Sequence, residues 1–188
     1  MILSSYISNS IFDSKMTEVV FVPYDEKRHR DHFYQLTIEY MNWINETVYN
    51  RTGSNVFTDV ESYVESVFPK FTALTPPEGI VVILEVDGNP AGMGALRKLE
   101  DKVGEIKRMY VRPMYRGNGY GKQIMLYLED KAREFGFSFI RLDTGALNYP
   151  ARGLYEKYGY ELRDRYDGSE VSPEAGKLLN IIFMEKQL

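Results

Sequence analysis

The chain has 188 residues, of which 44% are hydrophobic and 27% charged, the size and composition of one globular domain with its own core. No apolar run approaches the ~20 residues needed to cross a bilayer, and the net charge of −4 is opposite to the basic excess typical of nucleic-acid binding. We therefore expect neither a membrane nor a nucleic-acid partner.

Residues 1–16 form an N-terminal extension of Ser, Asn, Tyr and a few aliphatics, without the basic cluster and apolar core of a secretory signal. Met16 precedes the first strand pattern and is a second candidate start. The extension is an upstream start, an arm packed on the body, or an oligomer contact such as that of a homodimer. We expect residues 17–188 to form a single domain.

The spacing of apolar residues predicts the elements of the first half. A strand at 17–23 is followed by a long or broken helix at 25–50, a helix at 59–74, and strands at 79–86, 91–99 and 102–112. Gly53 separates the two helices, Pro77 follows the second, and Asp87-Gly88-Asn89 is a hairpin turn.

The second half continues the alternation of helix and strand. After a glycine-rich segment come a helix that ends at Gly136, a strand at 140–144, a short helix from Pro150, and strands at 160–165 and 180–186. This order predicts an α/β fold in which helices flank one mixed sheet on both faces.

Histidine and cysteine usage limits the chemistry. His29 and His32 lie three residues apart, but no Cys or carboxylate partner completes a metal site, so we predict no metal and place both at the surface. The absence of cysteine excludes a disulfide framework and a cysteine acyl-enzyme, and it fits a reducing compartment. We expect a cytoplasmic protein.

The segment 116–121, Arg-Gly-Asn-Gly-Tyr-Gly, lies between a strand and a helix. Its alternate glycines let backbone N–H groups turn toward one point at the positive end of the helix, where phosphate binds. A dinucleotide fingerprint requires glycine where Lys122 stands, and a nucleoside-triphosphate loop requires Ser or Thr where Gln123 stands. The spacing Arg-x-x-Gly-x-Gly instead resembles the pyrophosphate loop of the GNAT acyltransferase superfamily, which binds coenzyme A.

A second segment resembles the same superfamily. The strand at 140–144 is followed by Asn148 and then by Leu-Tyr-Glu-Lys-Tyr-Gly-Tyr at 154–160, and seven residues separate Asn148 from Tyr155. The resemblance covers residues 80–162. It implies a GNAT fold, with a single mixed, mostly antiparallel sheet and splayed central strands, in an N-acetyltransferase domain that uses acetyl-CoA as co-substrate.

The resemblance also assigns the cofactor-binding residues. Backbone N–H groups of Met109, Tyr110 and Val111 are the candidates for holding the pantetheine arm and polarising the thioester oxygen. The pyrophosphate and its helix involve Arg116, Gly117, Asn118, Gly119, Tyr120, Gly121 and Lys122. Basic residues cluster over 107–122, where a 3′-phosphate and the pyrophosphate would lie. Asn148 would hydrogen-bond the coenzyme A arm, cap the following helix, or both.

Three residues are catalytic candidates on the same grounds. Tyr155 falls where similar enzymes carry the acid that protonates the leaving thiolate, and the alternative is a buried packing aromatic. Glu105 lies where several members place a catalytic glutamate, often acting through water, and Asp143 matches the base position of others. Either carboxylate is alternatively solvated or salt-bridged.

The resemblance implies transfer of an acetyl group to a primary amine, and the absence of cysteine favours direct transfer in a ternary complex. The acceptor is a small-molecule amine, an amino acid or a peptide N-terminus. Aromatic and acidic residues of the first two helices suit a cationic amine or form an ordinary amphipathic pair: Tyr40, Trp43, Glu46, Tyr49, Phe57, Asp59 and Glu61. A non-catalytic acyl-CoA sensor is the alternative, against which Tyr155 and Glu105 count.

Overall fold

The computed structural model describes residues 17–188, except the side chains at positions 174 and 178, so the extension at 1–16 lies outside the described residues. One seven-stranded sheet has the order β1-β2-β3-β4-β5-β7-β6. Its strands are β1 (Val19–Pro23), β2 (Gly79–Val86), β3 (Asn89–Glu100), β4 (Val103–Val111), β5 (Phe139–Gly145), β6 (Glu161–Arg163) and β7 (Ile181–Gln187). β4 and β5 are parallel and all other neighbours antiparallel, which confirms the predicted mixed sheet.

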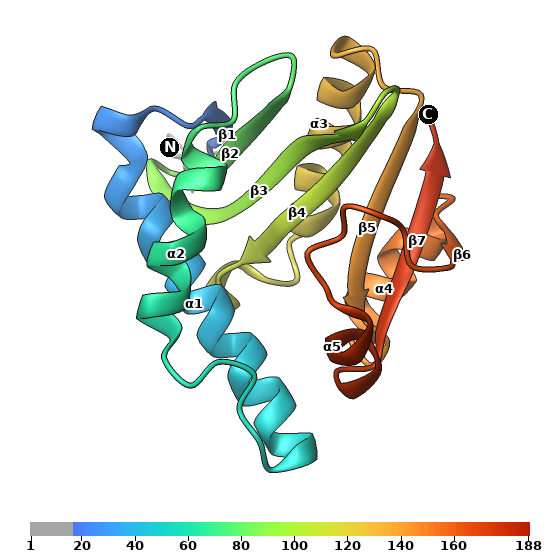
Figure 1. Cartoon of the computed structure of the whole chain (residues 1–188). Helices are drawn as coiled ribbons and strands as arrows, with labels where there is room; N and C mark the ends of the chain where they lie inside the picture. The colour runs from blue at the N-terminus through green and yellow to red at the C-terminus, as the bar shows by residue number, and fades with distance from the viewer. Residues whose placement is uncertain (1–16) are drawn as a thin grey trace, which may run out of the picture.

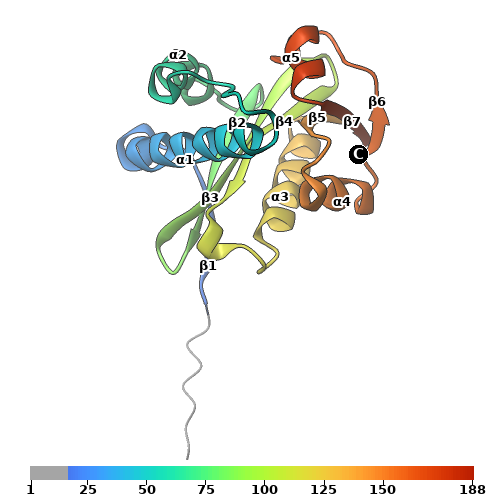
Figure 2. The same ribbon diagram turned by 90° about the horizontal axis from the view of Figure 1, so that it is seen from below.

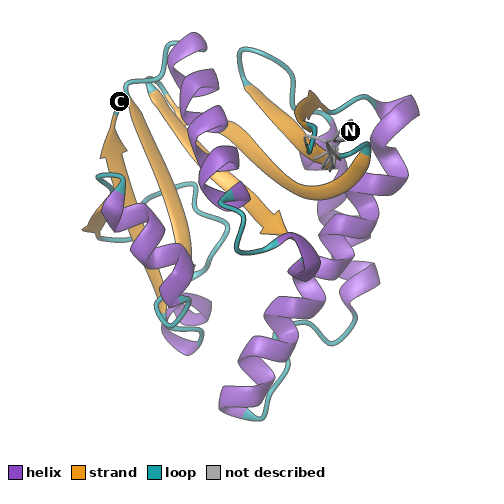
Figure 3. Cartoon of the chain, turned by 180° about the vertical axis from the view of Figure 1, so that it is seen from behind, coloured by secondary structure: helices purple, strands orange, loops and turns teal. Residues whose placement is uncertain are grey.

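Helices cover both faces of this sheet (Figures 1 and 2). α1 (Glu26–Thr52) and α2 (Val60–Thr72) lie on one face. α3 (Tyr120–Glu134) and α4 (Tyr149–Lys157) lie on the other, in front of the strands when the molecule is seen from behind (Figure 3). Two short helices were not predicted: η1 (Pro113–Tyr115) and α5 (Pro173–Leu178). Within residues 17–188, no helix has both the length and the apolar composition to span a membrane.

Each face of the sheet has its own core because β2 is apolar on both sides. Val82 and Leu84 pack in the cluster that includes α3, whereas Val81 and Ile83 pack in the cluster that includes α1 and α2. All four side chains are buried. The uninterrupted apolar run of residues 79–84 therefore places β2 between two helical layers.

The helix boundaries follow from their end residues. α1 is one continuous helix that ends where Gly53 adopts a left-handed φ of 72°, and Asp59 caps α2 by accepting from the Ser62 N–H at 3.0 Å. His32 is exposed as predicted, but the surface prediction for His29 is wrong. His29 is buried because its Nδ1 accepts from the Asp25 N–H at 3.0 Å at the start of α1.

The predicted splay lies between the two central strands. β4 pairs with β5 only from Val103 to Glu105, and the strands then diverge (Figure 1). A register shift between β3 and β4 coincides with a left-handed φ of 55° at Arg108, the mark of a β-bulge. Among the described residues, no strand pairs with the β4 edge that faces β5 beyond Glu105, so backbone groups there are available to a ligand.

Candidate active site

A cavity of about 390 Å³ occupies the fork between β4 and β5. Among its lining residues are most of the predicted ones: Met109, Tyr110, Val111, Arg116, Gly117, Gly119, Tyr120, Gly121, Asp143, Asn148 and Tyr155. Glu105, Asn118 and Lys122 do not line it. The fork thus brings the glycine loop, the free edge of β4 and α4 to one space.

The glycine loop leads into the N-terminus of α3. Gly117 and Gly119 have left-handed φ angles of 83° and 76°, which glycine adopts without strain. The Gln123 N–H bonds to the Gly119 carbonyl at 3.1 Å and is the first amide of the helical ladder. The amides of Tyr120 and Gly121 therefore have no intrahelical acceptor, and with the helix dipole they form an anion-binding site.

Gly121 leaves open space at this site. A Cβ added there would meet no atom of the chain within 4 Å, and φ at Gly121 is not left-handed. The fold therefore places no demand for glycine at this position. A diphosphate that binds the backbone amides would require glycine here, because a side chain would occupy the space of the diphosphate. The residues present fit the pyrophosphate of coenzyme A.

Three further residues of the loop have separate roles. The Arg116 Nε donates to the Val111 carbonyl at 2.9 Å, and its guanidinium lies 5.4 Å from the Trp43 ring centroid. Arg116 therefore ties the loop to β4 and α1. The Asn118 side chain donates to the Tyr115 carbonyl at 3.1 Å and shapes the loop from within. Lys122 is exposed in the first turn of α3.

Tyr155 and Asn148 enter the cavity from α4 and its start. Tyr155 is 6% exposed, and its hydroxyl donates to the Met109 sulfur at 3.7 Å. Burial above all, with a further contribution from the neighbouring Tyr40 and Asp143, raises the pKa of Tyr155 above its usual 10.0, so the phenol keeps its proton. Asn148 stands at the N-cap of α4 without a side-chain capping bond, which leaves its amide available in the cavity wall.

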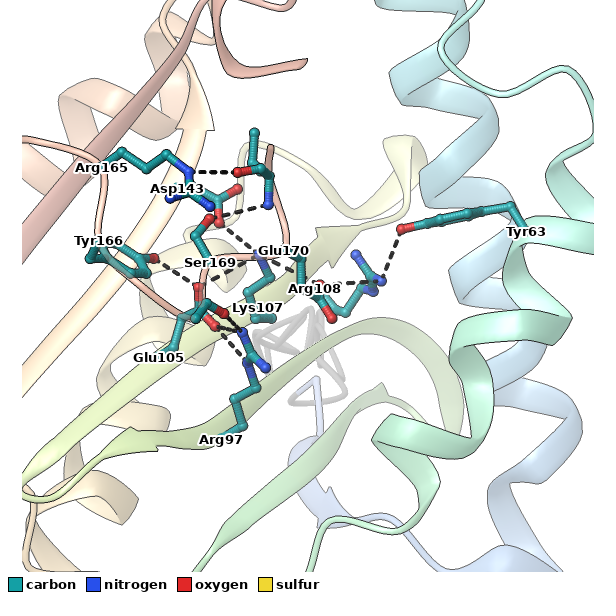
Figure 4. A network of polar contacts seen from close by, with 12 residues as sticks. Tyr63, Arg97, Glu105, Lys107, Arg108, Asp143, Arg165, Tyr166, Ser169 and Glu170 are labelled. Atoms are coloured by element: carbon teal, nitrogen blue, oxygen red, sulfur yellow. Dashed lines mark hydrogen bonds and ion pairs between the residues drawn. The ribbon is translucent and has the colours of Figure 1, made fainter. Parts of the chain in front are cut away.

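The two candidate bases have different surroundings (Figure 4). Asp143 lines the cavity and accepts from the Lys107 Nζ at 2.6 Å. Glu105 is fully buried outside the lining, where it accepts from the Arg97 Nε at 2.6 Å and the Tyr166 hydroxyl at 2.7 Å. Both carboxylates thus have the salt-bridged arrangement considered above, and of the two only Asp143 lines the cavity.

The basic cluster in the sequence suggested that Lys107 and Arg108 lie with the basic groups of the glycine loop. In the structure they lie instead among carboxylates. Burial alone would lower the pKa of Lys107, but the carboxylates of Asp143 and Glu105 raise it, so Lys107 stays charged. Glu170 lies 3.7 Å from Lys107 and 3.9 Å from Arg108. It comes from the segment between β6 and α5, which the sequence patterns did not connect with the site.

The predicted acceptor wall is only partly at the cavity. Tyr40 and Trp43 line it from α1. The acidic residues proposed for a cationic amine do not: Asp59 caps α2, and Glu46 and Glu61 are exposed. The wall next to the cavity is therefore aromatic, and the charged residues that line the cavity are Lys107, Arg108, Arg116 and Asp143.

The forked sheet and the glycine loop have the architecture expected of an acyl-CoA-dependent acyltransferase. Residues 30–160 of the 188-residue chain match the acetyltransferase (GNAT) family. The chain therefore belongs to the GNAT family and is an enzyme of the acyltransferase class.

Individual relatives agree with this assignment. An uncharacterized N-acetyltransferase, YsnE, of Bacillus subtilis is 30% identical over 153 residues, which cover 73% of this chain and 95% of that protein. An IAA acetyltransferase of Azospirillum brasilense is 30% identical over 138 residues, covering 69% of this chain and 86% of that protein. The PaiA N-acetyltransferase of Thermoplasma acidophilum, solved in complex with coenzyme A, superposes with a TM-score of 0.68 at 16% identity, covering 91% of this chain and 99% of that chain. This last likeness concerns the fold alone.

Proposed function

We propose that residues 17–188 are a single catalytic domain that transfers the acetyl group of acetyl-CoA to a primary amine in a ternary complex. The observation that carries the proposal is the cavity, which is lined both by the glycine loop and by Asp143 and Tyr155. Two substrates can thus meet in one space. The coenzyme A in the PaiA structure and the acetyl-CoA in a GNAT acetyltransferase structure from Elizabethkingia anophelis support the choice of co-substrate.

Each part of the cavity has a role in this proposal. Amides of Tyr120 and Gly121 hold the pyrophosphate, and the free edge of β4 from Met109 to Val111 holds the pantetheine arm. Acetyl-CoA supplies the acetyl group as a thioester. The same edge offers N–H donors to the carbonyl oxygen, and one preorganised donor of this kind is worth about 3 kcal/mol in the transition state.

Transfer requires one proton to leave the amine and one to reach the departing sulfur. The amine nitrogen forms the new N–C bond as the C–S bond breaks, and the sulfur takes the bonding electron pair. Asp143 is placed to receive the amine proton because it lines the cavity. In this proposal Tyr155 donates toward the departing sulfur, since it lines the cavity and its hydroxyl has only the weak Met109 sulfur as acceptor.

Direct transfer predicts the form of the steady-state kinetics. The chain contains no cysteine to carry an acetyl group. Initial rates at varied acetyl-CoA and amine should therefore give double-reciprocal lines that intersect. Parallel lines, together with an acetylated protein detected by mass spectrometry after incubation with acetyl-CoA alone, would contradict this mechanism.

The two carboxylates should respond differently to substitution. Asp143→Asn should lower kcat by about 100-fold near neutral pH and recover partly at high pH, where more of the amine is already neutral. Asp143 contributes most to the raised pKa of Lys107, so Asp143→Asn also lowers the pKa of Lys107. Glu105→Gln should lower the melting temperature, and it should lower the rate by the same factor at every pH. If alkaline rescue appears in the Glu105 variant instead, Glu105 is the base.

A further inference from the structure

Arg108 is a buried cation in the wall of the cavity. It stands at the β-bulge of β4 with a left-handed φ of 55°, a conformation that is unfavourable for a residue with a side chain. The bulge turns its side chain toward α2, where Tyr63 lies opposite (Figure 4). The side chain is 8% exposed. Arg108 is one of the residues that line the cavity, and the groups around its guanidinium border that lining.

The guanidinium lacks a close acceptor. It lies 4.6 Å from the Phe71 ring centroid, its Nη2 is 3.5 Å from the Tyr63 hydroxyl, and the nearest carboxylate, that of Glu170, is 3.9 Å away. Among the described residues, its buried Nε has no hydrogen-bond partner. By contrast, Arg112 makes close contacts to Glu39, with Nη2 at 2.7 Å. Arg108 is therefore buried with only a loosely paired carboxylate, whereas Arg112 has a close one.

Burial of this kind is unfavourable unless a ligand completes it. An unmade hydrogen bond to a buried charged donor is destabilising, because the donor has lost its water without gaining a partner. The flat guanidinium fork matches a carboxylate, to which it can donate two parallel bonds. The arrangement is thus suited to an anion that arrives with the substrate.

The other cations that line the cavity already have close partners, since the Arg116 Nε donates to the Val111 carbonyl at 2.9 Å. Lys107 already donates to Asp143 at 2.6 Å. Glu170 is 25% exposed and lies at 3.7 Å from Lys107 and 3.9 Å from Arg108, beyond hydrogen-bonding distance of both. A substrate carboxylate at closer range would bind Arg108 better than Glu170 does.

We propose that the acceptor is an amine that also carries a carboxylate, such as a free amino acid, and that Arg108 binds this carboxylate with help from the Tyr63 hydroxyl. The proposal rests on the acetyltransferase function and narrows it to one substrate class. The positive charge of Arg108 selects against polyamines and other purely cationic acceptors. Asp143, on the other side of the fork, faces the same cavity and is available to the amine.

The test compares acids with their matched amides. Release of free coenzyme A is measured for a panel of α-, β- and γ-amino acids, for the corresponding carboxamides, and for the amines without the carboxyl group. We expect kcat/KM to be about 100-fold higher for the best acids than for their amides, because Arg108 would stay unpaired when an amide is bound. Arg108→Gln should remove this preference by raising KM for the acids, with little change for the amides, and Arg108→Lys should keep part of it.

Arg30→Gln is the matched control, because Arg30 also lies over a phenylalanine ring, at 5.5 Å from Phe68, but is exposed and does not line the cavity. It should keep the wild-type preference. Binding of acetyl-CoA, measured by calorimetry, distinguishes a failure of the acetyltransferase proposal from a failure of the carboxylate proposal. If the wild-type protein fails to bind acetyl-CoA, the acetyltransferase proposal fails. If acetyl-CoA binds but amides or plain amines react as well as the acids, if no acid reacts, or if Arg108→Gln keeps the preference, the carboxylate proposal is wrong.

Discussion

Gly121→Glu is expected to abolish measurable acetyl-CoA binding while the protein stays folded. The fold tolerates a side chain at this position, since an added Cβ would meet nothing within 4 Å. Glutamate also favours a helix over glycine by about 0.5 to 1 kcal/mol, and its charge suits the first turn. The same charge lies against the site of the pyrophosphate and occupies its space. We expect the dissociation constant measured by calorimetry to rise at least ~100-fold, equivalent to about 2.7 kcal/mol.

Gly153→Glu is the control for this variant. Gly153 is an exposed helical glycine of α4, it too has open space around an added Cβ, and it does not line the cavity. Both variants should melt at or above the wild-type temperature, but only the Gly121 variant should lose acetyl-CoA. Equal affinity in the two variants would mean that the pyrophosphate does not bind at the start of α3.

Local sequence patterns predicted most of the fold because the relevant forces act over short distances along the chain. The apolar residues at 79–86 predicted the strand β2, and Gly53 marked the end of α1. The strand expected at 160–165 is shorter, as β6 ends at Arg163. α5 was missed because a six-residue helix has too few turns for an apolar period to be recognised.

The candidate site was less predictable where it depends on pairs of distant residues. The glycine loop could be recognised because its function lies in the backbone of consecutive residues. Glu105 was different, because its surroundings come from Arg97, eight residues away across the β3–β4 register, and from Tyr166, 61 residues away. Arg108 likewise could be placed only once the β-bulge was known, since a shift of one residue sends a strand side chain to the other face.

Tyr155→Phe is expected to reduce kcat by about 100-fold without changing the fold or the affinity for acetyl-CoA. The ring is buried and packs 5.6 Å from that of Tyr160, and phenylalanine preserves this packing. The hydroxyl has only a weak sulfur acceptor, Met109, so its loss removes little stability. What the variant loses is a donor aimed at the departing sulfur.

The raised pKa of Tyr155 determines how this donor acts and how it is tested. A thiol has a pKa of about 8.5, so full proton transfer from a phenol above 10.0 is uphill, and the hydroxyl acts mainly by hydrogen-bonding the sulfur as negative charge develops. Ionisation of Tyr155 should then produce no loss of rate below pH 10. Tyr160→Phe removes the hydroxyl of the neighbouring ring, which does not line the cavity, and should leave kcat unchanged. If the two variants are equally active, a different group or water serves the sulfur, and Tyr155 contributes only packing.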